Sequence, residues 1–151
     1  MTTKKDDSSN QSIGYLTGIA YRAINRTLSN NLKVAGNKIT SEQYGVLKQL
    51  WAKQGLTQLD IAKATHKDKP GITRLLNNLE QKGLIERKVN KEDKRCNKIY
   101  LTKAGKDLKK SSVQIGTNTK DQAIEGVSEK ELEICKKVLA QISTNLEENN
   151  I

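Results

Sequence analysis

Phenylalanine is absent from this sequence, and aromatic residues of all kinds make up only 3% of its 151 residues. Hydrophobic residues together amount to 34%, which is little for a core that one chain of this length builds alone. The shortage predicts that a partner subunit completes the core. No long apolar run and no signal-peptide pattern are present, so we expect a soluble, cytoplasmic protein that does not associate with a membrane.

Cysteine and histidine are also scarce, which limits the chemistry available to the chain. The two cysteines, Cys96 and Cys135, lie far apart without metal-ligand spacing, so we expect neither a disulfide framework nor a zinc site. His66 is the only histidine, and we expect it to be a solvated turn residue. No nucleophile–base pair, glycine-rich phosphate loop or carboxylate cluster is recognisable. The sequence therefore predicts a protein that is not an enzyme and that needs no cofactor.

Positive charge, in contrast, is abundant. The net charge is +10, from 27 basic and 17 acidic residues, although a lysine-rich composition alone can produce such a total. The distribution is more informative, because residues 40–102 hold 13 basic and 7 acidic residues and so carry +6. Three of the five arginines, Arg74, Arg87 and Arg95, lie within this segment. A basic face of this kind favours a polyanionic partner such as nucleic acid.

The spacing of apolar residues predicts a mostly α-helical fold. A long amphipathic helix covers residues 12–35, and Gly36 ends it. A second helix begins after Thr40, which forms a capping box with Gln43, and it stops near Gly55. These two helices precede the segment in which the basic residues cluster.

Two more helices are predicted towards the C-terminal end. Thr102 caps a helix that continues to about Gly126, and the weak helix formers at 111–118 are where it bends or frays. A capping box of Ser128 with Glu131 begins the last helix. Its apolar residues recur at helical spacing on one face: Leu132, Cys135, Val138, Leu139, Ile142 and Leu146.

Two short helices joined by a tight turn lie in the middle of the chain. Thr57 caps the first, which runs to about Ala64, and Asp68 caps the second. Pro70 is tolerated in the first turn of the second helix, because a residue there needs no intrahelical donor. Gly83 ends this helix as a left-handed cap.

Beyond Gly83 the apolar period changes from helical to alternating. Residues 85–89 and 98–101 read as two short strands, which are joined by the polar tip 90–97. Two short helices followed by a basic ribbon are the parts of a winged helix-turn-helix. The predicted fold class is therefore mostly α, with a small wing of two or three antiparallel strands and helical dimerisation arms.

The second short helix, residues 69–82, has two different faces. At about 100° per residue, the face opposite its apolar stripe carries Pro70, Thr73, Arg74, Asn77 and Gln81. Arginine can bind guanine through two hydrogen bonds, asparagine or glutamine can bind adenine, and a threonine methyl can contact thymine. Lys67 and Lys69 flank the N-terminal turn, whose free N–H groups suit a phosphate. The alternative interpretation is an ordinary solvated helix face.

The tip of the ribbon is short and charged. An arginine there can enter the narrow minor groove, where the negative potential is enhanced, and Asp93 is placed to orient Arg95 through a bidentate pair. An Asp-x-Arg pattern taken alone is more often a surface salt bridge. The predicted DNA-binding residues are Lys67, Lys69, Pro70, Thr73, Arg74, Asn77, Asp93, Lys94 and Arg95.

At these residues the sequence resembles the MarR-type regulators of bacteria. The resemblance covers about residues 12–148, and residues 56–105 carry most of its specificity. The most specific match is the wing pattern Asp93-Lys94-Arg95 followed by Leu101-Thr102. Other matching residues are Leu56-Thr57, Ile61-Ala62, Asp68-Lys69, Thr73-Arg74, Leu79-Glu80 and Lys82-Gly83-Leu84-Ile85-Glu86-Arg87, with Thr40 to Tyr44 upstream and Gly126 to Glu129 downstream.

The resemblance implies a homodimer that represses transcription from a pseudo-palindromic operator in double-stranded DNA. Residues 12–36 and 103–151 would form its helical dimerisation region, and residues 37–102 its DNA-binding domain. The polar residues 1–11 are expected to form a disordered tail. Recognition helices would enter successive major grooves, and wing arginines would enter the flanking minor grooves.

Many members of the family are released from DNA by a small aromatic or phenolic ligand, which binds between the dimerisation and DNA-binding regions. Candidate residues for the wall of such a ligand pocket are Tyr21, Tyr44 and Trp51. Each of them can equally well be a packing residue of the hydrophobic core.

Two alternative functions stay open. A winged helix can serve protein–protein contact only, but such a module would not need Thr73, Arg74, Asn77 and Arg95 all facing outward. A thiol-based redox sensor acting through Cys96 is the other, because a neighbouring cation can raise a thiol's reactivity. Redox-sensing relatives carry their reactive cysteine in the first helix, and this chain has none there. Cys135 lies on an apolar helical stripe, so we expect it to be a packing residue.

Overall fold

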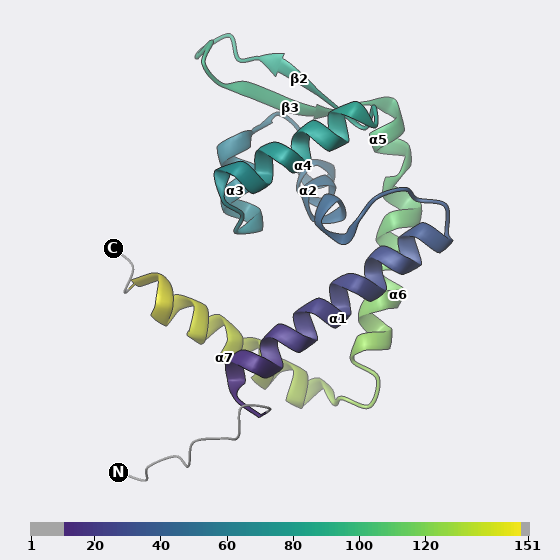
Figure 1. Ribbon diagram of the computed structural model, residues 1–151, viewed down its shortest axis with the longest axis vertical. Helices are drawn as coiled ribbons and strands as arrows, with labels where there is room; N and C mark the ends of the chain where they lie inside the picture. The colour runs from purple at the N-terminus through teal and green to yellow at the C-terminus, as the bar shows by residue number, and fades with distance from the viewer. Residues whose placement is uncertain (1–10, 149–151) are drawn as a thin grey trace. The chain divides into compact units, whose positions relative to one another are not determined.

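A computed structural model describes residues 11–148 of the chain (Figure 1). Most of them are helical and one small sheet is present, which confirms the predicted fold class. The chain divides into two compact units between Thr119 and Lys120. The predicted tail, residues 1–11, lies outside the described residues except for Gln11. In chain order, the elements are α1 (Ile13–Val34), α2 (Ser41–Ala52), β1 (Leu56–Thr57), α3 (Gln58–Thr65), α4 (Lys69–Gln81), β2 (Ile85–Val89), β3 (Asn97–Leu101), α5 (Lys103–Asp107), α6 (Lys109–Ala123) and α7 (Glu129–Glu148).

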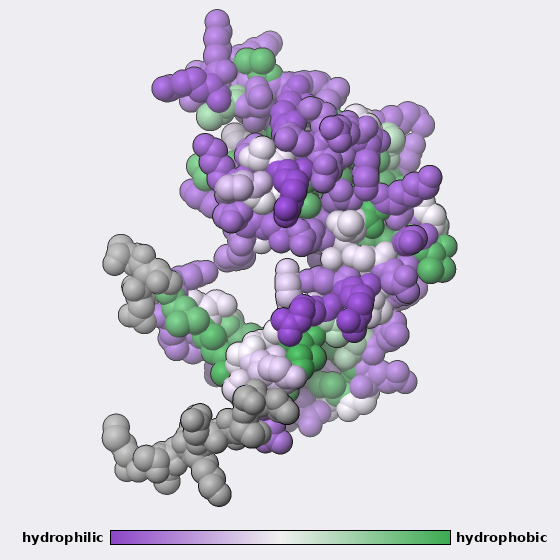
Figure 2. Space-filling view, in the orientation of Figure 1, coloured by the Kyte–Doolittle hydropathy of each residue, from purple (hydrophilic) through white to green (hydrophobic). Residues whose placement is uncertain are grey.

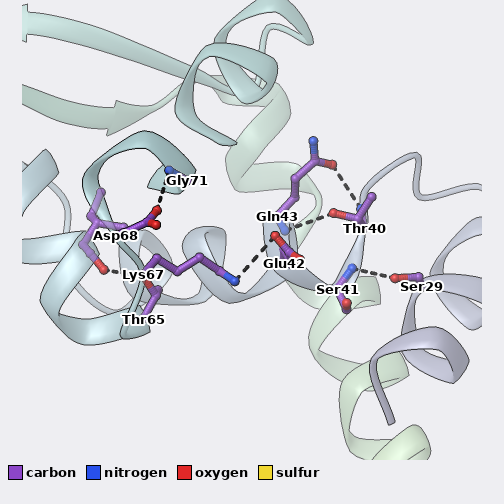
Figure 3. Close-up of polar contacts among 10 residues, drawn as sticks. Ser29, Thr40, Ser41, Glu42, Gln43, Thr65, Lys67, Asp68 and Gly71 are labelled. Carbon is purple, nitrogen blue, oxygen red and sulfur yellow. Dashed lines mark hydrogen bonds and ion pairs between the residues drawn. The ribbon is translucent and has the colours of Figure 1, made fainter. Parts of the chain in front are cut away.

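Helices begin at the caps that the sequence predicts. Thr40 Oγ1 accepts a hydrogen bond from Gln43 N at 3.2 Å, and Gln43 Oε1 accepts from Thr40 N at 3.0 Å (Figure 3). Asp68 Oδ1 accepts from Gly71 N at 2.8 Å at the start of α4 (Figure 3). These side chains satisfy N–H groups that the first turn of a helix leaves without a partner. At the far end of α4, Gly83 has a φ of +71°, the left-handed conformation that glycine adopts readily.

The sheet has three antiparallel strands in the order β1-β3-β2. Ile99 in β3 faces Leu56 of β1 on one side and Arg87 of β2 on the other. The strands β2 and β3 match their predicted positions, but the sequence pattern placed Leu56 and Thr57 only at a helix cap. Two residues are too short to show alternation, and β1 is a strand only because β3 pairs with it.

The helix predicted from 102 to about 126 is two helices in the structure. The interruption lies at Leu108, between α5 and α6, and residues 111–118 are helical throughout, so the expected position of the bend was wrong. Tertiary contacts explain the difference. Ser112, a weak helix former, is fully buried, and its hydroxyl accepts a hydrogen bond from Asn37 Nδ2 at 2.9 Å.

The core of the first unit is made of aliphatic side chains from α1 to β3. The apolar stripe predicted on α4 is its centre, because Ile72, Leu76 and Leu79 are fully buried and Leu75 is nearly so. The remaining members are Leu32, Ile39, Val46, Leu47, Leu50, Ile61, Leu84, Ile85, Ile99 and Leu101. This core holds α4 in place and leaves its opposite face to solvent.

Two helices keep large apolar side chains at the surface. On α1 they include Ile13, Leu16, Ile19 and Ile24, and on α7 they include Ile134, Val138, Leu139 and Leu146. Figure 2 shows hydrophobic residues of α7 at the surface in green. Cys135 of α7 is exposed as well, so the packing role expected for it is not fulfilled within this chain. No helix among the described residues is both long and apolar enough to cross a membrane.

Candidate nucleic-acid interface

The outer face of α4 gathers the polar side chains that helical spacing predicts. They line one shallow depression, and the surface over α4 is predominantly hydrophilic (Figure 2). The residues of this face are Lys69, Pro70, Thr73, Arg74, Asn77, Asn78 and Gln81. We call this set the α4 face. Because the opposite side of α4 is buried, the α4 face has a fixed direction in the first unit.

Thr73 of the α4 face has its hydroxyl engaged within the protein. Its Oγ1 donates to the carbonyl oxygen of Lys69 at 2.8 Å and accepts from Gln58 Nε2 at 2.6 Å. The hydroxyl proton is therefore already used. The Gln58 contact could not be predicted from the sequence pattern of α4, because Gln58 belongs to α3.

Asn77 of the α4 face is bound by an arginine from the neighbouring strand. Arg87 Nη2 donates to Asn77 Oδ1 at 2.9 Å, and Arg87 Nη1 donates to Glu80 Oε1 at 3.0 Å. Only 19% of the Arg87 side chain is exposed. The sequence indicated Arg87 as part of the basic cluster, but not as a partner of Asn77.

The cations around α4 fall into two groups. Lys67 Nζ lies 3.5 Å from Glu42 Oε2, so its charge is paired with α2 (Figure 3). Among the residues that the structure describes, Lys69, Arg74 and Lys94 have no ion-pair partner, and all three are exposed. These three cations are therefore available to an external anion. The charge of Lys67, in contrast, is partly neutralised by Glu42.

The tip of the β2–β3 hairpin extends away from the helices of its unit (Figure 1). The Arg95 side chain there is 92% exposed. Its Nε lies 3.3 Å from Asp93 Oδ1, which also accepts from the backbone N of Arg95 at 3.0 Å. Asp93 thus contacts the guanidinium through one nitrogen, and the bidentate pair expected from the sequence is not formed. The exposed thiol of Cys96 lies 3.8 Å from Asp93 Oδ2, which makes Asp93 the organising residue of the tip.

The aromatic residues suggested as ligand-pocket walls lie in different surroundings. Tyr44 and Trp51 pack edge to face, with ring centroids 5.9 Å apart, and Trp51 Nε1 donates to the Gly105 carbonyl at 2.9 Å. Burial raises the pKa of Tyr44. Tyr21 is 60% exposed on α1. The structure thus joins two of the three residues in a packed pair.

A cavity of about 1000 Å³ separates α3 and the start of α4 from the hairpin. Apolar side chains such as Leu59 and Ile72 line it together with Lys63, Arg95 and Cys96. Sequence spacing does not predict this cavity, because its walls come from segments far apart in the chain. No cluster of three or more potential metal-ligating side chains occurs between residues 11 and 148.

Two helices at a tight turn, with a polar outer face on the second and a basic hairpin beside it, define a winged helix-turn-helix, a class of DNA-binding domain. The MarR family model matches residues 39–97. The chain is 33% identical to MepR of S. aureus, solved in complex with DNA, with 89% of this chain and 98% of that chain covered and a TM-score of 0.81. It is 25% identical to the transcriptional regulator SlyA, with 91% and 96% covered and a TM-score of 0.82.

BpsR of Bordetella bronchiseptica shares the fold at 20% identity, with 92% of this chain and 98% of that chain covered and a TM-score of 0.83. The chain belongs to the MarR family of winged-helix, DNA-binding transcription regulators. Members of this family are regulators and not enzymes. The resemblance found in the sequence is thereby confirmed.

Proposed function

We propose that the protein is a homodimeric repressor that binds a pseudo-palindromic operator. In this proposal α4 enters the major groove and the β2–β3 tip enters the adjacent minor groove. The observation that carries the proposal is Arg74, an exposed cation with no ion-pair partner among the described residues, on a helix whose other side is buried. A base-reading side chain needs such a rigid support and free donors. MepR, the relative solved with DNA, supports the same role.

The proposed contacts divide by chemistry. Thr73, Arg74 and Asn77 lie where they would meet base edges, and Lys69 and Lys94 are free to bind phosphates. Pro70 is exposed in the first turn of α4, on the same face as these residues. Arg95 is the minor-groove residue and Asp93 restricts its motion, because their side chains lie 3.3 Å apart. Lys67, which is paired with Glu42, contributes less than its charge alone suggests.

Dimerisation is the second part of the proposal. The exposed apolar side chains of α1 and α7 would be covered by a second copy of the chain, since burial of apolar area contributes about 25 cal/mol per Å². Residues 12–36 and 103–151 are then the dimerisation region, and residues 37–102 are the DNA-binding domain. A C2 dimer presents two copies of α4, which matches an operator with two related half-sites.

Release by a small aromatic or phenolic ligand is the third part. BpsR, whose DNA binding is regulated by 6-hydroxynicotinic acid, supports it by analogy of fold. A panel of aromatic acids and phenols, titrated into the preformed protein–DNA complex, tests this part separately. A compound that lowers operator affinity and raises the melting temperature of the free protein is the expected result, and a panel without effect contradicts it.

The test of the whole proposal is a gel shift with DNA flanking the protein's own gene, beside random DNA of equal length. We expect preferential binding of one flanking fragment, and a reporter joined to that fragment should be repressed in cells. Binding of neither DNA would favour the alternative of a winged helix used for protein–protein contact. Equal binding of both would exclude sequence-specific regulation.

A further inference from the structure

The inner side of α6 is made of small and mostly polar residues. Ser112, Gly116 and Thr119 recur at helical spacing on one face, and Ser112 and Thr119 are buried. Ile115, the apolar residue on the same side, is only partly buried against the core. Residues this small let a neighbouring helix approach closely, but they supply little apolar area to hold it. Specific contacts must therefore carry much of the attachment of α6 within the first unit.

Two asparagines supply the first of these contacts. Asn37 Nδ2, in the segment between α1 and α2, donates to the hydroxyl oxygens of Ser111 and Ser112, each at 2.9 Å. Asn31 Nδ2, in α1, donates to Thr119 Oγ1 at 2.9 Å. Hydrogen bonds require set distances and angles, whereas apolar side chains can slide past one another. These contacts therefore fix the position of α6 along its own axis.

The second kind of contact fixes the distance between α6 and α2. A Cβ atom at Gly116 would overlap the hydroxyl oxygen of Tyr44 and would lie 2.9 Å from Tyr44 Cζ, so the ring can pack there only against a glycine. The ring of Trp51 packs against Tyr44, with centroids 5.9 Å apart, and Trp51 Nε1 donates to the Gly105 carbonyl of α5 at 2.9 Å. The aromatic pair of α2 thus touches both α5 and α6.

We propose that Tyr44 and Gly116 are positioning residues that set the spacing between the operator half-sites. Their contact fixes the direction of α6, and α6 crosses the boundary between the two units at Thr119 and Lys120. In the proposed dimer, the two copies of α4 are joined through the dimerisation region, to which α6 belongs. A change in the direction of α6 therefore changes their separation. The inference rests on the proposed function, which supplies the dimer and its two half-sites.

The spacing of half-sites on DNA is a sensitive measure of such a change. Half-sites one helical turn apart are about 34 Å from centre to centre, and one inserted base pair moves a half-site by about 3.4 Å and turns it by about 35°. A bound dimer can follow only if the protein or the DNA deforms, at a cost in affinity. A close contact between α2 and α6 consequently gives a strong preference for one spacing, and a disturbed contact weakens that preference.

The test measures the affinity of the full-length protein for an operator obtained by binding-site selection, for the same operator with one base pair added or removed between its half-sites, and for a single half-site. The ratio of affinities for the selected and the altered spacing is the spacing preference. Gly116→Ala pushes the Tyr44 ring away from α6 and should lower this preference by roughly fivefold. Its affinity for the single half-site should equal that of wild type, because α4 is unchanged.

A second variant tests whether the two residues act through each other. Tyr44→Leu removes the ring atoms that lie closest to Gly116, so it should also lower the spacing preference. The double variant should restore much of the preference, because the alanine methyl group then occupies space that the ring has vacated. Two unrelated structural defects would add to each other instead of compensating.

Gly45→Ala is the matched control. It is the same change within a helix, with the same effect on helix propensity, but its Cβ would meet no atom of the described residues within 4 Å. It should keep the wild-type spacing preference. The inference is overturned if folded Gly116→Ala keeps that preference as well, or if the double variant restores none of it.

Two further outcomes are also decisive. If Gly116→Ala does not fold, Tyr44→Leu decides alone, and an unchanged spacing preference in that variant overturns the inference. A wild-type protein that binds a single half-site as tightly as the selected operator contradicts the proposed function itself.

Discussion

The helices α4 and α7 are both amphipathic, but the chain covers the apolar face of only one of them. In α4, the exposed fractions of Ile72, Leu75, Leu76 and Leu79 lie between 0% and 5%. In α7, Ile134, Val138, Leu139 and Leu146 are between 40% and 60% exposed. Each helix therefore has a different face available for a partner. The polar face of α4 suits DNA, and the apolar face of α7 suits another protein surface.

The difference has consequences for what a substitution can do. We expect a change on the inner side of α4 to act on the folding of the first unit, and a change on the apolar side of α7 to act on the proposed association. We expect changes on the outer face of α4 and at the hairpin tip to act on the proposed binding of DNA, with little effect on stability.

The largest effect is expected from Leu76→Ala. Leu76 is fully buried in the core, and truncation of such a leucine removes contacts and leaves a cavity. The free energy of unfolding should fall by about 2–5 kcal/mol, as measured by denaturant unfolding. Leu59→Ala, the same change at a position of α3 that is 62% exposed, is the control and should change it by less than about 0.5 kcal/mol. Similar losses for both would mean that α4 is not held by the core.

The next effect concerns association through α7. Leu139→Asp places an unpaired charge where the proposed dimer buries apolar side chains, and burying such a charge is costly, so the dimer should weaken more than about tenfold. Light scattering should report about twice the 16.8 kDa chain mass for wild type and one chain mass for the variant. Lys137→Asp, a charge change in the same helix, should leave the dimer intact. A folded wild-type monomer at micromolar concentration would contradict this part of the account.

A smaller effect is expected at the hairpin tip. Arg95→Ala should change the stability by only about 0–1 kcal/mol, because the contact between Arg95 and Asp93 is exposed. Its operator affinity should fall most on A-tract flanks, where the minor groove is narrow, and less on G·C flanks. Asp93→Ala should act in the same direction but more weakly. Fluorescence anisotropy at fixed salt measures these losses.

The controls for the tip are Lys109→Ala and Lys137→Ala, which remove a positive charge away from the proposed footprint. Both should lower operator affinity less than Arg95→Ala does, and without dependence on the flanks. Equal losses for all three variants would mean that overall charge, and not a placed wing, drives binding.

The smallest effect is expected at the start of α3. Thr57 Oγ1 accepts from Asp60 N at 3.1 Å, and Asp60 Oδ2 accepts from Thr57 N at 2.9 Å. The hydrogen bond from the Thr57 backbone N–H, and after it one from the Thr57 side chain, lower the pKa of the Asp60 carboxyl. Thr57→Ala should lower the free energy of unfolding by about 1 kcal/mol near neutral pH.

The same capping box predicts a dependence on pH. Because the pKa of Asp60 is lower in the folded state, its contribution is complete above the ordinary range of an aspartate and is lost as the pH falls through the folded pKa. Thr57→Ala keeps the backbone donor and removes only the side-chain contribution to the lowered pKa, so its difference from wild type should shrink slightly in acid. Urea unfolding at pH 7 and at pH 3 measures it, and a difference that grows in acid would contradict the role of Asp60.

The face of α4 could be predicted from the sequence because it depends on local information. Four apolar residues at helical spacing, a cap at Asp68 and a stop at Gly83 fix where the helix lies and which side is buried. The hairpin was predictable for the same reason. The strand β1 and the interruption at Leu108 were not, because they depend on pairing and packing with distant segments.

The hydrogen-bond and ion-pair partners of the individual site residues could not be predicted from the sequence either. Asn77 is bound by Arg87, ten residues away, and Thr73 is bound by Gln58, fifteen residues away. Lys67, in the turn between α3 and α4, is paired with Glu42 of α2. Sequence spacing shows which side chains share a helical face, but not which of their donors and acceptors the rest of the fold uses. Likewise, the apolar stripe of α7 predicts a helix without saying what covers it.

The central claim is that α4 reads bases through Arg74, and its most direct test compares Arg74→Ala with Lys69→Ala on operator and on random DNA of equal length. The account predicts that Arg74→Ala costs about 1–3 kcal/mol per half-site on the operator and much less on random DNA. Lys69→Ala should weaken both DNAs alike and reduce the slope of affinity against salt by about one. Equal losses on operator and random DNA for Arg74→Ala would contradict the claim.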